Sequence, residues 1–163
     1  MIPFAQAVDT FLNRLIDDAF DQLHGLPGDA LNDWRPRQEM ADINTFFALA
    51  THLVGAGEYW VLHAAGGQPL DRDRPAEFRA RGNLEELEAR YARWMEASAK
   101  LLQELGESDL ARLPDLGETF ATQGERPWTV AECLMHAVEH TAVHVGHLQI
   151  QRQLWNAEMA TAT

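Results

Sequence analysis

The sequence predicts an all-α protein, a four-helix bundle with long connecting loops, in a single domain over residues 1–163. Three observations support this fold class. Four long segments repeat apolar residues at intervals of three and four, the period of an amphipathic helix. No segment of comparable length alternates polar and apolar residues as a half-buried strand does. Connectors rich in Pro, Gly and Asp separate the four segments, and 163 residues are enough to bury one core.

The first two predicted helices each end at glycines. The first covers Pro3 to Leu23 and stops at the segment 25–28. Its proline lies in the first turn, where the fixed φ suits a helix. The second runs from about Asp42 to Ala65 and stops at Gly66 and Gly67.

The last two predicted helices are marked by polar residues at their N-terminal ends. The third begins after Asn83, whose side chain can cap the first turn, and runs to about Leu105, just before Gly106. The fourth opens with Thr129-Val-Ala-Glu132, the pattern of a capping box, and continues to about Trp155. Four helices of this length form a four-helix bundle.

The three connectors are longer than an up-and-down bundle needs. Each exceeds about ten residues, above the usual range for helix–helix connections. They can therefore carry crossovers, and their length does not decide which helices are neighbours. Their aromatic residues fit two interpretations, since they can line a pocket at the open end of the bundle or pin the loops onto it. These aromatic residues are Trp34, Phe120 and Trp128.

The charge balance and the apolar runs exclude several classes of partner. The chain has 25 acidic and 13 basic side chains, a formal net charge of -12. Such a surface repels phosphate backbones, so we expect no nucleic-acid partner. No apolar run approaches the roughly 20 residues that span a bilayer, so we expect no membrane partner. The first residues also lack the basic and apolar stretches of a signal peptide, so we expect a cytoplasmic protein.

The single cysteine, Cys133, narrows the chemistry further. One thiol excludes an internal disulfide framework and a zinc site built from several cysteines. A metal site in this chain must therefore use nitrogen and oxygen ligands. Nothing in the sequence marks the thiol as activated, so we expect a small core residue and not a nucleophile.

The strongest functional signal is a stripe of four histidines on the fourth helix. Their spacings of four, four and three place them within an arc of roughly 80°. A buried imidazole needs hydrogen bonds or a metal ion. Side chains four residues apart stand one turn apart, with Cβ atoms about 6 Å away from each other, so two of them can bind one ion. The four are His136, His140, His144 and His147.

A third ligand has to come from another helix, and one histidine has the right surroundings. His24 and His63 lie at the C-terminal ends of the first and second helices, where a charged imidazole complements the helix dipole. His52 lies in the middle of the second helix instead. Its neighbours on the same face are Ala48 and Ala56, whose small side chains leave space beside it. His52 therefore has what an inward-facing ligand needs.

Two motifs carry a resemblance to a known family. The first is Thr51-His52-Leu53, followed by Glu58 and Trp60, and the second is Glu139-His140-Thr-Ala-Val-His144-Val-Gly146. With the Pro-Trp-Thr approach to the fourth helix, they resemble the DinB/YfiT-like superfamily of metal-binding four-helix bundles. The resemblance covers almost the whole chain. It implies that His52, His140 and His144 bind one divalent metal ion.

The chain departs from the family pattern beside the last ligand. Valine replaces a frequent histidine before it and a frequent arginine after it, and histidine replaces the usual glutamine. None of these departures removes a ligand. Under the resemblance, His136 and His147 support the ligands or line the pocket. The departing residues are Val143, Val145 and His147.

The resemblance also implies a class of function. Members include thiol-dependent S-transferases and isomerases that use low-molecular-weight thiols, and proposed metal-dependent hydrolases. We therefore expect an open three-histidine site in a metal-dependent enzyme of thiol S-transferase or hydrolase type. Its expected partners are a small-molecule substrate, with a low-molecular-weight thiol as the candidate, and a second copy of the chain in a homodimer. Zn²⁺ or Ni²⁺ is the expected ion, and Fe²⁺ and Mn²⁺ fit the same ligands.

His147 is the candidate general base, because it lies on the same stripe one turn from His144. Two other functions stay open. A non-catalytic metal-binding or sensing module would use histidines that titrate between about pH 5 and 8 or that hold a structural ion. A haem-binding bundle would use two histidines, although the chain has no Cys-x-x-Cys-His attachment motif.

Overall fold

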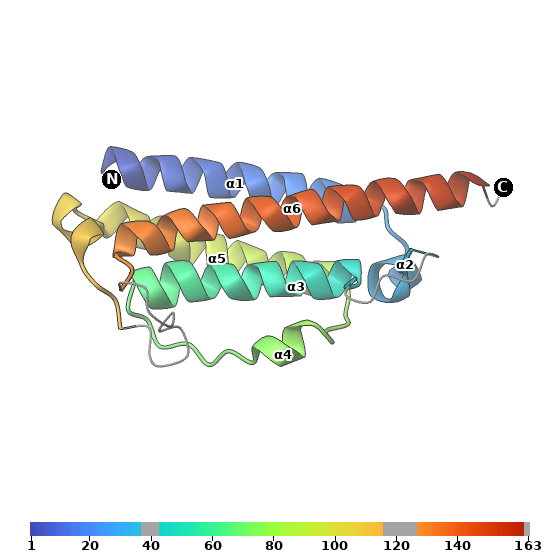
Figure 1. Cartoon of the computed structure of the whole chain (residues 1–163), viewed down its shortest axis with the longest axis horizontal. Coiled ribbons are helices and arrows are strands. Elements are labelled where there is room, and N and C mark those ends of the chain that lie inside the picture. The colour runs from blue at the N-terminus through green and yellow to red at the C-terminus, as the bar shows by residue number, and fades with distance from the viewer. Residues whose placement is uncertain (37–42, 116–126, 162–163) are drawn as a thin grey trace.

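The computed structural model describes residues 1–36, 43–115 and 127–161, and within these ranges it contains helices and no strand (Figure 1). Four long helical segments form a bundle, so the predicted fold class is confirmed. None of the helices in these ranges is both long enough and apolar enough to cross a membrane. The four segments are α1 (Pro3–Leu23), α3 (Phe46–Gly57) with its continuation η1 (Glu58–Ala65), α5 (Leu84–Glu104) and α6 (Val130–Thr161).

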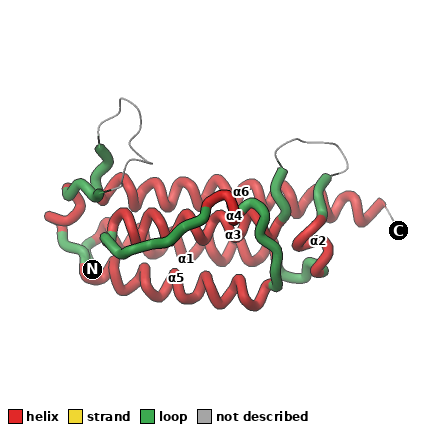
Figure 2. The backbone as a smooth tube through the Cα atoms, turned by 90° about the horizontal axis from the view of Figure 1, so that it is seen from below, coloured by secondary structure: helices red, strands yellow, loops and turns green. Residues whose placement is uncertain are grey.

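Each long helix packs against two of the others. α1 contacts α5 and α6, and α3 contacts the same two helices from the other side. In Figure 1, α1 and α6 run in one direction, whereas α3 and α5 run in the other. Two parallel helices follow each other along the chain, so the segment 66–83 has to return along the outside of the bundle before α5 can begin (Figure 2). The lengths of the connectors allowed a crossover, and the segment 66–83 forms one. We call it the crossover segment.

Shorter helices lie in the connectors, where the sequence predicted none. They are α2 (Gly28–Asp33), η2 (Glu107–Ala111) and, in the crossover segment, α4 (Arg74–Glu77). The single turn of α4 has a local cause. Asp73 is its N-cap and accepts a hydrogen bond from the amide of Ala76, and Pro75 stands in the first turn.

The capping residues place the helix starts where the sequence predicted them. The Asn83 side chain accepts a hydrogen bond from the amide of Glu86, at 2.8 Å. Thr129 and Glu132 form the predicted capping box, with bonds of 2.8 and 3.3 Å to each other's amides. α6 differs at its other end, because it continues beyond Trp155 to Thr161.

The second predicted helix differs more, since it changes its winding half-way. α3 begins at Phe46 with Thr45 as its N-cap, and the predicted start, Asp42, lies outside the described residues. From Glu58 onward the turns are π-helical, so each holds more residues than in an α-helix. Gly57 stands at the junction. A Cβ there would lie only 2.6 Å from two indole atoms of Trp94.

The sequence left open whether the aromatic residues of the connectors line a pocket or pin the connectors onto the bundle. The ring of Trp34 stacks on Phe46 at 5.6 Å, and its indole nitrogen donates a hydrogen bond to Glu158. Trp34 therefore pins the loop after α2 onto the bundle. Trp128 stacks on Trp60 at 5.3 Å and also lines a surface pocket, so it fits both interpretations. Phe120 lies outside the described residues.

Candidate metal centre

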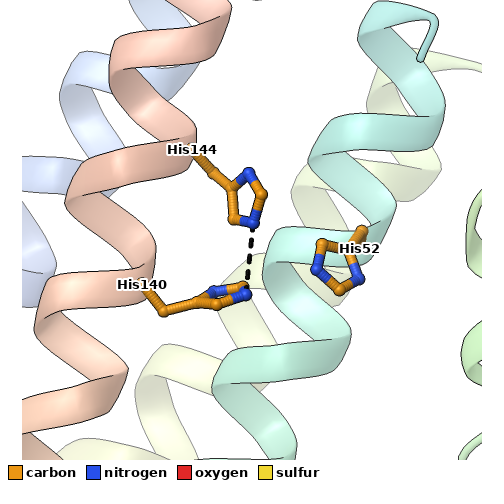
Figure 3. Close-up of side chains that lie close together, drawn as sticks. All are labelled: His52, His140 and His144. Atoms are coloured by element: carbon orange, nitrogen blue, oxygen red, sulfur yellow. Dashed lines mark hydrogen bonds between the residues drawn. The ribbon is translucent and has the colours of Figure 1, made fainter. Parts of the chain in front are cut away.

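The three predicted metal ligands lie together between two neighbouring helices. His52 comes from the middle of α3, and His140 and His144 come from successive turns of α6 (Figure 3). One nitrogen from each ring lies within 4.8 Å of the other two. The ring centroids are 4.3 Å apart for His140 and His144, and 5.1 and 5.0 Å from His52 to each of them. Three imidazoles therefore converge on one point.

The environment keeps the two candidate ligands on α6 uncharged at neutral pH. Burial, followed by the charge of nearby histidines and of Arg72, lowers the pKa of His140 to about 3. Burial, followed by nearby histidines and Arg74, lowers the pKa of His144 to about 4. A neutral imidazole has a free lone pair, and this is the form that binds a metal ion. Both residues are only partly buried.

His52 is held differently, because its ring is fully enclosed. Its Nδ1 lies 2.8 Å from a carboxylate oxygen of Glu77, in α4, and the two residues are only 4 and 5% exposed. The Phe78 ring stacks on the imidazole at 4.5 Å. Arg72 donates two hydrogen bonds to the Glu77 carboxylate, at 2.7 and 2.9 Å. Burial alone would raise the pKa of Glu77, but its hydrogen bonds to His52 and Arg72 and the positive charge of Arg72 outweigh burial and hold the pKa below its usual range.

This donor set fits a divalent metal ion. The Nε2 atoms of His140 and His144 are 3.1 Å apart, close to the roughly 3.3 Å that separates two nitrogens on a tetrahedral ion with bonds of about 2.0 to 2.1 Å. Across residues 1–36, 43–115 and 127–161, no other three His, Cys, Asp or Glu side chains gather in this way.

The other two histidines of the stripe flank the ligands. His136 lies edge-on against Trp60 and Trp128, with ring centroids 4.7 and 5.1 Å away, and its ring is 5.7 Å from that of His140. His147 is exposed, and its ring lies 5.3 Å from that of His144. Neither ring belongs to the three-histidine group.

Comparison with known proteins identifies a family. A family model described as mycothiol-S-transferase matches residues 7–157. The chain belongs to this family. The family is DinB/YfiT-like, so the resemblance found in the sequence is confirmed. No curated protein matches the chain significantly.

Two solved structures share the fold of this mycothiol S-transferase family member. A conserved protein from Enterococcus faecalis has a TM-score of 0.69 and 15% identity, covering 94% of this chain and 98% of its own. A protein from Streptococcus pneumoniae has a TM-score of 0.67 and 11% identity, covering 96% of this chain and 92% of its own. At such low identity, the likeness shows the fold alone.

The remaining candidate residues of this family member, His24, His63 and Cys133, lie outside the three-histidine group. The exposed His24 pairs with Glu88 at 2.7 Å, and His63 bonds through Nδ1 to the backbone oxygen of Gln68. Cys133 is completely buried, and burial, with the nearby Glu132 carboxylate, raises its pKa to about 11. Its thiol is therefore a core group, as expected, and not an activated nucleophile.

Sequence reasoning missed Glu77 and Arg72. One local signal was present, since Asp73 followed by Pro75 is the pattern of a helix start and predicts a turn in this connector. The connector holds several acidic residues, however. Which of them reaches His52 depends on the path of the crossover segment, and no spacing rule relates residues 25 positions apart.

Proposed function

We propose that this protein is a divalent-metal-dependent thiol S-transferase that joins a low-molecular-weight thiol of the mycothiol type to a small electrophilic substrate. The family match supports the thiol and the transfer reaction. The observation that carries the proposal is the convergence of His52, His140 and His144, of which the two α6 side chains are only partly buried. Zn²⁺ or Ni²⁺ is the proposed ion, with Fe²⁺ and Mn²⁺ as alternatives.

The reaction forms one bond and breaks another at the electrophilic centre. The thiol sulfur attacks that centre, the leaving group departs with its electron pair, and the thiol proton passes to a base. A divalent ion held by the three histidines would act as a Lewis acid that lowers the pKa of a thiol. The half-buried His140 and His144 mark the accessible side of the site, whereas His52 closes the opposite side against Phe78.

A direct assay tests the proposal. The protein, purified without a histidine tag and loaded with one equivalent of Zn²⁺ or Ni²⁺, should consume a mycothiol-type thiol and an alkylating electrophile together. Removal of the ion with a chelator should slow the reaction by roughly 100-fold or more, since Lewis-acid activation is worth several kcal/mol. Turnover of esters or amides without thiol would identify a hydrolase instead. A tightly held ion without turnover would identify a binding module.

His147 is the proposed general base for the thiol proton, because it is exposed beside His144. We expect His147→Gln to lower kcat by roughly 10² to 10⁴-fold at neutral pH, the usual contribution of general acid–base catalysis. Metal content should stay at the level of the parent protein. His24→Gln is the matched control, because that histidine is also exposed but pairs with Glu88. Equal kcat values for the two variants would remove His147 from the mechanism.

The homodimer, the cytoplasmic location and the absence of a nucleic-acid partner stay predictions. Light scattering of the purified protein measures whether one or two chains are present. Electrophoretic mobility of labelled DNA and RNA tests the effect of the net charge of -12.

A further inference from the structure

We propose that Glu77 is a positioning residue of the metal site, which fixes the ring of His52 so that its Nε2 lone pair faces His140 and His144. The inference rests on the metal ion of the proposed function, but the role of Glu77 can be measured in the metal-free protein. It concerns a buried ion pair on the crossover segment, outside the three ligands themselves.

The hydrogen bonds around Glu77 decide which ring nitrogen of His52 carries the proton. Arg72 can only donate, so both of its bonds run to the carboxylate. A carboxylate paired with a guanidinium in this way accepts hydrogen bonds and has no proton to donate. The Nδ1 of His52, 2.8 Å away, must therefore be the protonated nitrogen. A neutral imidazole has one proton, so Nε2 keeps its lone pair.

The Glu77 carboxylate occupies a space beside the backbone of α3 at Gly55. Gly55 lies one helical turn from His52, and a Cβ on it would overlap with a carboxylate oxygen of Glu77 and lie 2.9 Å from its Cδ. The carboxylate therefore packs directly on the helix backbone, in space that only glycine leaves open. Arg72 closes the outer side, and its side chain is itself largely buried.

This arrangement has a known effect on metal sites. A ligating histidine whose second nitrogen donates to a carboxylate has a fixed ring orientation and a more basic ligand nitrogen. Loss of such a partner weakens metal binding by roughly 10 to 100-fold. Only His52 among the three ligands has a carboxylate partner of this kind in the described residues. Glu77 should therefore act on the affinity of the site through the α3 ligand.

Glu77→Gln tests the inference, with Glu58→Gln as the matched control. A glutamine amide has one oxygen and one NH₂ group, so either orientation places NH₂ against a donor of Arg72. The control removes the same charge from a carboxylate that accepts hydrogen bonds from Nε and Nη2 of Arg90 and has no histidine partner among the bonds found in the described residues. We expect Glu77→Gln to bind Zn²⁺ 10 to 100-fold more weakly in competition with a chelator, and Glu58→Gln to stay within about twofold of the parent.

Nitrogen-15 NMR of the metal-free protein supplies the second readout. We expect the parent protein to show His52 protonated at Nδ1. We expect Glu77→Gln to show a mixture of two neutral forms of His52, one protonated at Nδ1 and the other at Nε2. Gly55→Ala should reproduce the loss of affinity without removing any polar group, because its methyl group displaces the carboxylate. Melting curves test whether each variant is folded.

Two results would overturn the inference. One is a Zn²⁺ affinity of Glu77→Gln equal to that of Glu58→Gln, and the other is a parent protein whose His52 is protonated at Nε2. A parent protein that binds no metal ion would instead contradict the proposed function, and the NMR measurement would still decide the role of Glu77. The two failures are therefore distinguishable.

Discussion

Replacement of His52 by alanine should abolish stoichiometric metal binding and, with it, the proposed transferase activity. His52 supplies the α3 side of the site, and without it His140 and His144 are left as two neighbouring ligands on one helix. We expect the Zn²⁺ affinity to fall by more than about 100-fold, since even the partners of ligands contribute roughly 10 to 100-fold. Elemental analysis after gel filtration and chelator competition measure the change.

The same substitution also affects stability, so a second variant is needed. His52 is buried, and its loss removes one of the two partners of the Glu77 carboxylate and leaves a cavity, with an expected cost of about 3 kcal/mol. His140→Ala avoids this cost, because His140 is half-buried and has no carboxylate partner in the described residues. His24→Ala is the control with full metal content. Normal metal content in both His52→Ala and His140→Ala would rule out the assigned site.

The parts of this structure that follow from local sequence were predicted well. The start of α5 depends on Asn83 and that of α6 on Thr129 and Glu132, and each of these residues bonds to an amide three positions away. The spacing of His140 and His144 likewise guarantees that their rings meet on one face. Such contacts are set by helix geometry alone, so a sequence is enough to find them.

The missing parts depend on contacts between distant segments. The bond from His52 to Glu77 requires the crossover segment to return over α3, and the length of the connector does not specify that path. The apolar pattern of the sequence also does not predict the change to π-helical winding after Gly57. Apolar residues such as Tyr59 and Trp60, which are buried, fit an α-helix equally well. Both features concern how α3 meets its neighbours.

The three residues at which the chain departs from the family pattern differ in burial and in their distance from the proposed metal site. Val145 is 3% exposed and belongs to the core, and Val143 is 50% exposed on the surface of α6. Neither side chain belongs to the group of three ligands. The third departure, His147, has its ring beside that of His144. Selectivity for the substrate should therefore depend on this position more than on the two valines.

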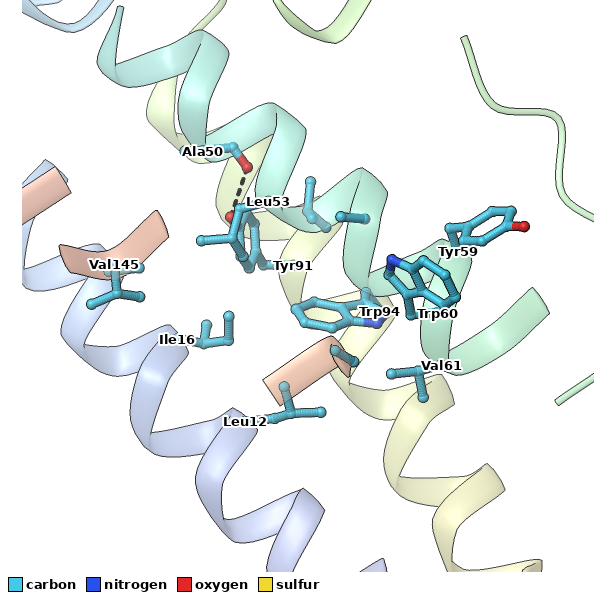
Figure 4. Close-up of a cluster of buried hydrophobic side chains, with 14 of the residues drawn as sticks. Leu12, Ile16, Ala50, Leu53, Tyr59, Trp60, Val61, Tyr91, Trp94 and Val145 are labelled. Carbon is cyan, nitrogen blue, oxygen red and sulfur yellow. Dashed lines mark hydrogen bonds between the residues drawn. The ribbon is translucent and has the colours of Figure 1, made fainter. Parts of the chain in front are cut away.

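Substitution of Gly57 by alanine should destabilise the bundle without removing the metal site. The indole of Trp94 is 1% exposed and lies within the cluster of buried hydrophobic side chains (Figure 4). A Cβ added at Gly57 would lie 2.6 Å from its Cε2 and Cη2 atoms. Neither group can move freely, since one is backbone and the other is packed in the core. We expect a loss of about 3 kcal/mol in the free energy of unfolding, or roughly 10 °C in Tm.

A double-mutant cycle identifies the cause of this loss. Trp94→Phe removes the indole atoms that the new methyl group would meet, so Gly57→Ala should cost at least about 1 kcal/mol less in the Trp94→Phe background than in the parent. Gly28→Ala is the control, because a Cβ there meets no atom within 4 Å and should change stability by less than about 0.5 kcal/mol. Equal costs of Gly57→Ala in both backgrounds would show that the clash with Trp94 is not its cause. Since the metal ligands are not part of this contact, Zn²⁺ affinity measured below the melting range should remain that of the parent in all four proteins of the cycle.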